Sequence, residues 1–312
     1  MTKIFKILSA TTGLNTKVDP ARLPYDPEKG IADLAVAYNV DIDDTGRVGR
    51  RKGFTQQVST DCHSLFCDGG ACLYVTGDAL TLLRTDYGTK ALRNVHAGSV
   101  MRYAQVNDET YYCNGWQTGR VADEVSMSWV MADTWYGPDT DREYSDPPVG
   151  TDVAFHGGRM WVVEGDTVWY SEPFGLNYFD LAGCYFKFNT GVRMIRPVKE
   201  GIFISSSVAT YFFRGLGDPK EYYKIKVADF PVVQYTDVRV FGKLVLYQGG
   251  EFTIDTSFGD MSAMWMSEEG ICYAGYDGTF KNLTKYKVEK LPAALSGAGL
   301  LYKGNYFGLL NP

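Results

Sequence analysis

A short apolar strand, a turn rich in Gly, Asp or Asn, and a second apolar strand recur along the chain from about residue 62. This pattern excludes a mainly helical fold, since no 15-residue stretch keeps the 3.6-residue periodicity of an amphipathic helix. The seven hairpins are SLFCDGGACLYV (64–75), RYAQVNDETYYC (102–113), VAFHGGRMWVV (153–163), MIRPVKEGIFIS (194–205), VRVFGKLVLY (238–247), MWMSEEGICYAG (264–275) and GLLYKGNYFGLL (299–310). Their turns are 28 to 50 residues apart, mostly near the roughly 40–50 residues of one propeller blade.

Further strand candidates follow several hairpins, so the repeated unit has three or four antiparallel strands. They are ALTLLRT (79–85), TVWYSEP (167–173), ATYFFRG (209–215), EFTIDTS (251–257) and GTFKNLT (278–284). A β-sandwich also has short, regularly spaced strands, but it does not require so many similar hairpins. The sequence therefore predicts an all-β fold, a β-propeller of about six blades (five to seven). Because an open ring exposes sheet edges, we expect Val40–Ile42 and Val48–Phe54 to pair with 299–310 and close it.

Composition agrees with this fold and limits the partners. The 312 residues include 34 Gly, 22 Tyr, 17 Phe and 6 Trp, which suit turns and strands. The sequence has no window of 18 apolar residues, so no transmembrane helix is predicted. The first residues also lack the apolar run of a secretory signal. With 31 basic and 37 acidic residues the net charge is −6, which argues against a tight DNA clamp.

Two segments interrupt the repeat. Residues 13–30 contain three prolines without periodicity, so residues 1–30 are predicted to form an extended arm and 31–312 a single propeller domain. The stretch Ala32–Tyr38 suits either a helical turn or a strand. Residues 122–150, acidic and proline-rich at their end, are expected to be a long excursion between blades.

No pattern of catalytic residues stands out. The three histidines are His63, His96 and His156, and the sequence contains no G-x-S-x-G, H-E-x-x-H or P-loop motif. We therefore expect no enzyme activity, no catalytic residue and no cofactor.

Two metal-like clusters have simpler explanations. Cys62, His63, Cys67 and Cys72 lack the paired spacing of a zinc site, and the six cysteines are too sparse for a disulfide scaffold, so most are expected as small buried strand residues. The run from Asp41 to Gly46 (DIDDTG) resembles half a calcium loop, but its twelfth position is a lysine. A hairpin in which aspartates cap turn amides is the expectation, and no metal site is predicted.

The strongest local feature is the basic strip Arg47, Arg50, Arg51 and Lys52, four cations within six residues. Such a segment cannot be a buried strand. It is a solvated edge, a strip of contacts between subunits, or a contact to DNA phosphates. Between the last two, the acidic chain favours protein contacts.

The order of residues in 13–54 resembles the opening of a known family. The matching features are Gly13-Leu14-Asn15, Arg22-Leu23, Asn39-Val40-Asp41, Gly46, Arg50-Arg51 and Gly53-Phe54. They are similar to the opening of the tail nozzle (tail tubular, tail hub) proteins of short-tailed bacteriophages, over about 40 residues. This chain is less than half as long as those proteins and lacks their platform insertions.

The resemblance implies a structural virion protein of a phage tail, assembled in the cytoplasm of the host bacterium. It implies a homo-oligomeric ring, usually a hexamer, that contacts a portal-adaptor protein and tail fibre or tailspike proteins. Genomic DNA would pass through the ring with transient contacts only. The alternative is a propeller that binds or hydrolyses glycans at a host surface, with a pocket lined by aromatics such as Trp161, Trp169 and Tyr170.

Overall fold

The computed structural model describes residues 10–43, 45–68, 71–132, 142–241, 244–247, 251–254, 261–302 and 305–311. The chain divides into two compact units: unit 1 comprises Met1–Thr55 and Val233–Pro312, and unit 2 comprises Gln56–Val232. Helical structure in these ranges is limited to two short 3-10 turns, η1 (Pro20–Arg22) and η2 (Pro219–Glu221). The fold is therefore all-β, as predicted. No described helix has the length and apolarity needed to cross a membrane.

Unit 2 consists of four four-stranded antiparallel sheets, each made of strands consecutive in the chain. The first two are β6 (His63–Asp68), β7 (Ala71–Thr76), β8 (Ala79–Leu83), β9 (Thr89–Asn94), and β10 (Arg102–Val106), β11 (Glu109–Cys113), β12 (Thr118–Ala122), β13 (Val125–Met127). The next two are β14 (Asp152–His156), β15 (Arg159–Glu164), β16 (Thr167–Tyr170), β17 (Tyr185–Lys187), and β18 (Val192–Val198), β19 (Gly201–Ser206), β20 (Thr210–Arg214), β21 (Tyr223–Ala228).

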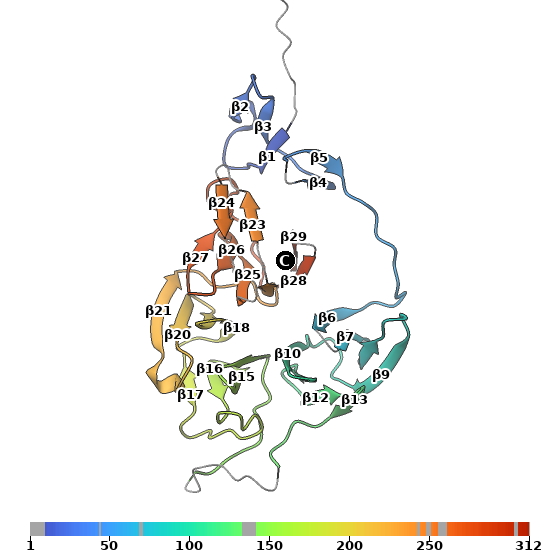
Figure 1. Cartoon of the computed structure of the whole chain (residues 1–312), viewed down its shortest axis with the longest axis vertical. Helices are drawn as coiled ribbons and strands as arrows, with labels where there is room; N and C mark the ends of the chain where they lie inside the picture. Colours follow the sequence, from blue (N-terminus) through green and yellow to red (C-terminus); the bar gives the residue numbers. More distant parts are fainter. Residues whose placement is uncertain are drawn as a thin grey trace, which may run out of the picture. The chain divides into compact units, whose positions relative to one another are not determined.

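The four sheets of unit 2 are arranged as propeller blades. Each first strand neighbours the first strand of the next sheet: β6 lies beside β10, β10 beside β14, and β14 beside β18. The fourth strands β9, β13, β17 and β21 lie at the outside (Figure 1). This meander with the first strand innermost is the form of a propeller blade.

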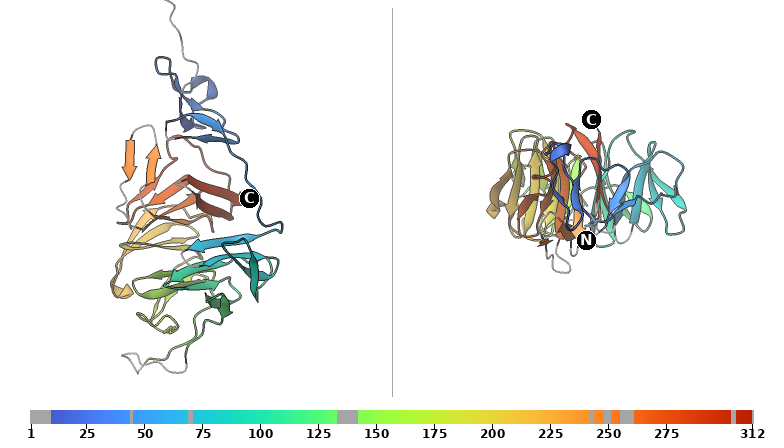
Figure 2. Two further views of the ribbon diagram at one scale, coloured as in Figure 1. Left: turned by 45° about the vertical axis from the view of Figure 1, so that its right-hand side comes forward. Right: turned by 90° about the horizontal axis from the view of Figure 1, so that it is seen from above.

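The core of unit 2 lies between the faces of successive sheets, which stack on one another in Figure 2. Apolar side chains of β7 and β8 such as Leu73 meet Tyr103 and Tyr112 of the next sheet. Similar clusters join the second sheet to the third and the third to the fourth, where Trp161 meets Ile202. Successive side chains of a strand point to opposite faces, and runs of buried residues such as those of β19 therefore pack on both faces of a sheet.

Among its described residues, unit 1 contains one four-stranded sheet in the order β22-β25-β26-β27, three two-stranded sheets and one three-stranded sheet. The large sheet comprises β22 (Val238–Phe241), β25 (Met261–Ser267), β26 (Gly270–Ala274) and β27 (Phe280–Asn282). The two-stranded sheets are β23 (Leu244–Tyr247) with β24 (Glu251–Ile254), β28 (Ser296–Tyr302) with β29 (Asn305–Asn311), and β4 (Val40–Ile42) with β5 (Val48–Arg50). A mixed sheet β1-β3-β2 contains β1 (Ala10–Leu14), β3 (Ile31–Leu34) and β2 (Tyr25–Asp26).

Six of the seven predicted hairpins are present as antiparallel pairs. The hairpin predicted over 238–247 is wrong, because β22 pairs with β25 and β23 pairs with β24. The physical reason is burial: the β22–β25 register places Val240 and Met264 in one core cluster with Tyr273. The hairpin β23–β24 is inserted between these two strands.

The predicted hydrogen-bonded pairing of the terminal strands is not found among the described residues. The hairpins β4–β5 and β28–β29 each form a sheet of their own. They meet instead through side chains, with the Arg51 guanidinium 5.8 Å from the ring centre of Phe307. Blade number and ring closure remain predictions.

The two interruptions of the repeat contain more regular structure than the sequence indicates. The arm predicted for 1–30 includes β1, η1 and β2, and Ile31–Leu34 is a strand. The excursion predicted over 122–150 begins with β13, which completes the second sheet after a turn with positive φ at Asp123 and Glu124. Within it Trp129 is buried and contacts Tyr111, and residues 133–141 lie outside the described residues.

Candidate interaction surface

The β4–β5 hairpin carries the predicted basic strip, and its turn is organised by Asp43. Oδ1 of Asp43 accepts hydrogen bonds from Thr45 Oγ1 at 2.6 Å and from the backbone N of Arg47 at 2.9 Å. These bonds, the Thr45 hydroxyl first, hold the pKa of Asp43 below its usual value. Asp43 therefore caps turn amides, as predicted. The described residues contain no group of His, Cys, Asp and Glu that would hold a metal ion.

The hairpin turn is anchored to the small β1-β3-β2 sheet. The backbone N of Thr11 donates to the carbonyl of Gly46 at 2.7 Å. Gly46 has φ +80°, and a Cβ there would lie 2.7 Å from the Thr11 carbonyl oxygen. The position of the basic strip thus depends on a residue without a side chain.

The four cations of the strip are all exposed, as predicted, but they are not equivalent. Nε of Arg51 donates to Oδ1 of Asp41 at 2.9 Å, and its guanidinium also lies over Phe307. Within the described ranges, the side chains of Arg47, Arg50 and Lys52 make no ion pair or hydrogen bond. Arg51 therefore holds the hairpin in unit 1, and the other three cations are available to a partner.

Apolar residues on the same hairpin, and Phe54 just after it, are also exposed. The exposed fractions are 37% for Ile42, 40% for Val48 and 80% for Phe54. An isolated two-stranded hairpin is marginal in water, because it buries little apolar surface. Exposed apolar side chains beside free cations therefore favour a covering partner over a purely solvated edge.

The segment that leads to this hairpin is fixed to the C-terminal part of unit 1 by a buried carboxylate. Asp33 accepts hydrogen bonds from Lys287 Nζ at 2.8 Å, from Asn15 Nδ2 at 2.7 Å and from Thr12 Oγ1. Burial acts to raise the pKa of Asp33, but the bonds from Lys287, Thr12 and Asn15 outweigh it, so the pKa is lowered. The backbone N of Thr16 also donates to the carbonyl of Lys287.

The histidines do not form a catalytic arrangement with carboxylates in the described part of the chain. His156 is buried and bonds the carbonyl of Gly215, and burial lowers its pKa despite that bond. His63 contacts the hydroxyl of its neighbour Ser64, and burial lowers its pKa too. His96 stacks on Trp116 with ring centres 4.1 Å apart.

The aromatic residues named for a glycan pocket are mostly core residues. Trp161 and Tyr170 are buried in the cluster between the third and fourth sheets of unit 2, with Trp161 Nε1 donating to the carbonyl of His156. Trp169 is partly exposed and bonds Glu164. Two of these three rings are therefore closed to a sugar.

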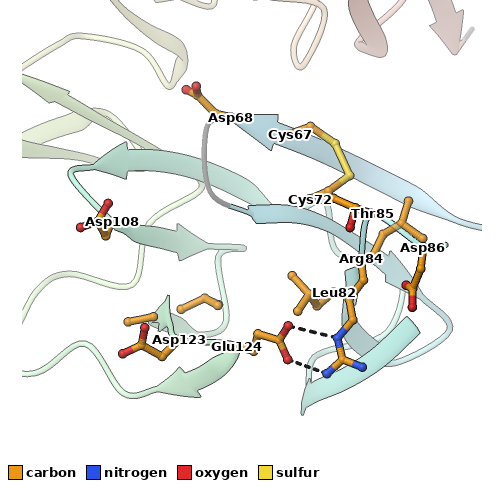
Figure 3. Close-up of a pocket in the computed structure, with 13 residues that line it drawn as sticks. Cys67, Asp68, Cys72, Leu82, Arg84, Thr85, Asp86, Asp108, Asp123 and Glu124 are labelled. Carbon is orange, nitrogen blue, oxygen red and sulfur yellow. Dashed lines mark hydrogen bonds and ion pairs between the residues drawn. A yellow bond between two sulfur atoms is a disulfide. The ribbon is translucent and has the colours of Figure 1, made fainter. Parts of the chain in front are cut away.

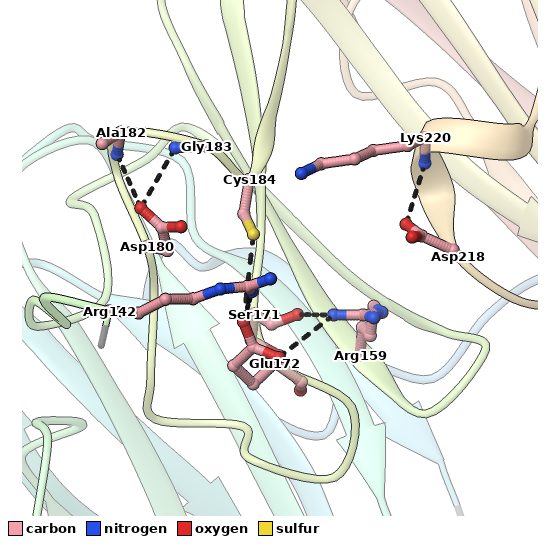
Figure 4. A network of polar contacts seen from close by, with 10 residues as sticks. All are labelled: Arg142, Arg159, Ser171, Glu172, Asp180, Ala182, Gly183, Cys184, Asp218 and Lys220. Atoms are coloured by element: carbon pink, nitrogen blue, oxygen red, sulfur yellow. Dashed lines mark hydrogen bonds and ion pairs between the residues drawn. The ribbon is translucent and has the colours of Figure 1, made fainter. Parts of the chain in front are cut away.

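An ionic network, which the sequence analysis missed, surrounds the largely buried carboxylate of Glu172 (Figure 4). Arg142 Nη1 lies 2.6 Å from Oε1 of Glu172, and Arg159 Nη1 lies 4.0 Å from Oε2. Arg159 also donates to the carbonyl of Ser171 at 2.6 Å, and Cys184 Sγ contacts Glu172. Through Arg142, the network ties the predicted excursion to the segment that follows β16 of the third sheet. No sequence signal joins Arg142 to Glu172, because the two residues are 30 positions apart and neither lies on a described strand.

The expectation that most cysteines are small buried strand residues is wrong for the cluster at 62–72, because Cys62 and Cys67 are exposed. Cys113, Cys184 and Cys272 are buried and reduced, and burial raises the pKa of each thiol. Cys67 and Cys72 form a disulfide between directly opposed positions of β6 and β7. The sequence signal for this bond was the position of Cys67 and Cys72 within the predicted hairpin 64–75.

No family model matches the sequence, and no curated protein matches it. Among solved structures the chain is similar to PorZ, a surface component of the type-IX secretion system of Porphyromonas gingivalis, at 14% identity over 87% of this chain and 36% of that chain, with a TM-score of 0.42. It is also similar to an extracellular domain of the two-component system BT4673 from B. thetaiotaomicron, at 6% identity over 79% of this chain and 31% of that one, with a TM-score of 0.44.

A third similar structure is XC5397, a gluconolactonase from Xanthomonas campestris, at 12% identity over 77% of this chain and 79% of that chain, with a TM-score of 0.36. The chain spans about a third of the length of the first two proteins. At these identities the similarity concerns the fold alone.

Proposed function

We propose that this chain is a structural subunit of a bacteriophage tail, of the nozzle or tail-hub type, that forms a homo-oligomeric ring. In this role it is not an enzyme and needs no cofactor. The ring is a conduit for genome ejection, with sixfold symmetry as in the family that residues 13–54 resemble. Its site of action is the virion, after assembly in the host cytoplasm.

The observation that carries the proposal is the uncovered β4–β5 hairpin. Arg47, Arg50 and Lys52 are exposed beside exposed Ile42 and Val48. Apolar area buried against a partner stabilises an interface, and guanidinium groups pair well with planar carboxylates. A protein partner explains both kinds of side chain, whereas phosphate alone would use only the cations.

The charge of the chain suits passage of DNA without tight binding. Every cation placed on a phosphate releases counterions and increases affinity, so a strongly basic lumen would retain the genome. A net charge of −6 is compatible with weak, transient contacts. The further partners in this role are a portal-adaptor protein and tail fibre or tailspike proteins.

The buried ionisable groups described above support a structural role. Asp33 is bonded to Lys287, and Glu172 is paired with Arg142. Asp152 is likewise paired with Arg102 at 2.8 Å and also accepts from the backbone N of Ile195. Such pairs fix elements relative to one another, because removing one partner leaves a buried charge.

The test is the mass of the native assembly, measured by native mass spectrometry and electron microscopy over a range of protein concentrations, with and without the adaptor protein. The expected result is a ring, with six subunits as the family implies. A protein that stays monomeric at high concentration and in the presence of the adaptor contradicts the proposal.

A further inference from the structure

A groove in unit 2 opens between the first and second sheets, where their hairpin turns gather (Figure 3). It has a volume of about 760 Å³ and apolar walls that include Leu82, Leu83 and Val121. Leu82 and Val121 are almost fully buried in the core cluster between these two sheets, whereas Leu83 is half-buried. The apolar surface that a partner can cover is therefore that of partly exposed lining residues such as Leu83.

The rim of this groove is acidic. It contains the carboxylates of Asp68, Asp86, Asp108, Asp123 and Glu124. The cations there are Arg84, which lines the groove, and Lys90, whose Nζ lies 3.8 Å from Oε2 of Glu124. Arg84 is already used, since its Nε and Nη2 donate to the two carboxylate oxygens of Glu124 at 3.0 and 2.5 Å. The exposed carboxylates of Asp108 and Asp123 make no side-chain bond to a described residue. The groove thus combines an apolar wall with an excess of negative charge.

Unit 1 carries an exposed apolar surface on the β28–β29 hairpin. Its register pairs Leu300 with Phe307 and Ala298 with Leu309, so these side chains share one face. On that face Leu300 is 51% exposed, Tyr302 is 52% exposed and Leu309 is 73% exposed. The other face, with Leu301 and Leu310, packs into the core of unit 1. The outer face of this hairpin is therefore apolar and uncovered.

The basic strip borders this apolar face. Arg51 reaches over Phe307 from the end of β5, so the β4–β5 hairpin lies beside the outer face of β28–β29. Arg47 and Arg50 are exposed on the same hairpin. An apolar centre bordered by cations complements an apolar groove bordered by carboxylates.

We infer that this surface of unit 1 on one copy docks into the acidic groove of unit 2 on a second copy. The inference deepens the proposed ring function, on which it rests, by naming the two faces of its subunit contact. The contact is head-to-tail, because two different surfaces meet, and repeated head-to-tail contacts generate a ring when the rotation closes. DNA does not fit the groove, since its phosphates are repelled by the same carboxylates that attract the strip.

Two charge-reversed proteins test the contact. The strip variant is Arg47→Glu/Arg50→Glu, and the groove variant is Asp108→Lys/Asp123→Lys. Neither pair of side chains makes a bond within the described structure, so the fold is expected to persist. A circular dichroism spectrum and melting temperature check this for each protein. An Asp78→Lys/Glu221→Lys protein is the matched control, because both acids are exposed and lie outside the groove.

Each variant alone is expected to assemble at least about tenfold more weakly than the natural chain, since like charges then face each other. Mixed in equal amounts, the two variants should assemble again, because each negative strip meets a positive groove and each positive strip meets a negative groove. A single chain with all four reversals should also assemble. The Asp78→Lys/Glu221→Lys control should assemble like the natural chain.

The readout is native mass spectrometry, which distinguishes the two variants by mass within one assembly. Alternating assemblies of the two variants support the contact. If the natural chain assembles but the mixture gives no more assembly than either variant alone, this contact is wrong and the ring proposal stands. The strip could also dock on the groove of its own chain. In that case each variant alone would lose stability, and the monomeric chain with all four reversals would have the stability of the natural chain. This result also overturns the inference. A natural chain that never assembles overturns the ring proposal itself.

Discussion

Lys287 Nζ lies 2.8 Å from Oδ1 of Asp33, which joins the N-terminal and C-terminal segments of unit 1 across 254 positions of sequence. The carboxylate is almost fully buried and also bonds Asn15 and Thr12. The same segment holds the turn of the β4–β5 hairpin through Thr11 and Gly46. A charge pair in the interior of unit 1 therefore positions the exposed strip that we assign to subunit contact.

Replacing Lys287 with Met should destabilise the protein strongly, because it leaves the buried carboxylate of Asp33 without its cation. The expected loss is about 3 kcal/mol in the free energy of unfolding. Urea denaturation followed by fluorescence measures it. Lys290→Met is the matched control: its partner Glu269 is more exposed, so its loss should stay below about 1 kcal/mol. Equal losses in the two variants would show that the Asp33 pair contributes no more than a surface pair.

The pH dependence of stability should change when Asp33 is replaced by Asn. The pKa of Asp33 is below its ordinary value of 3.8, so the folded state favours the ionised form. Its contribution to stability is therefore present above the ordinary pKa and is lost as the pH falls through the lowered one. The difference in unfolding free energy between the natural chain and Asp33→Asn should be constant near neutral pH and shrink below 3.8. Denaturation curves over that range measure it, and a difference that grows in acid contradicts the assignment.

Replacing Arg51 and Arg50 separately with alanine should distinguish the effect of the strip on stability from its effect on assembly. Arg51→Ala removes the pair with Asp41 and the contact with Phe307, which together contribute about 1 kcal/mol. Arg50→Ala removes no described contact, so its stability should stay within about 0.5 kcal/mol of the natural chain. Assembly measured by light scattering should nevertheless weaken in Arg50→Ala. If both variants match the natural chain in assembly, the strip is a solvated edge.

The sequence predicts the blades better than it predicts the pairs that hold them in place. Alternating apolar strands with short turns are local signals, so six hairpins were recognisable from residue types alone. The β22–β25 pairing is not local, because a whole hairpin is inserted between the two strands. Side-chain pairs such as Glu172 with Arg142 produce no periodic pattern in the sequence either, because irregular segments position them. Exposure of the basic strip was predictable, because four adjacent cations cannot be buried.

Gly46 provides the last test, because its backbone geometry places the basic strip. Its φ of +80° is unfavourable for residues with a side chain, and an added Cβ would lie 2.7 Å from the Thr11 carbonyl oxygen. Gly46→Ala should therefore cost about 1–3 kcal/mol of stability and also weaken assembly, because the β4–β5 hairpin moves. Gly53→Ala is the matched control, since a Cβ at Gly53 meets no atom within 4 Å and its φ is not in the left-handed region. Calorimetry and native mass spectrometry on both proteins measure the two effects. If Gly46→Ala loses stability but assembles normally, the hairpin's placement in unit 1 does not control the subunit contact.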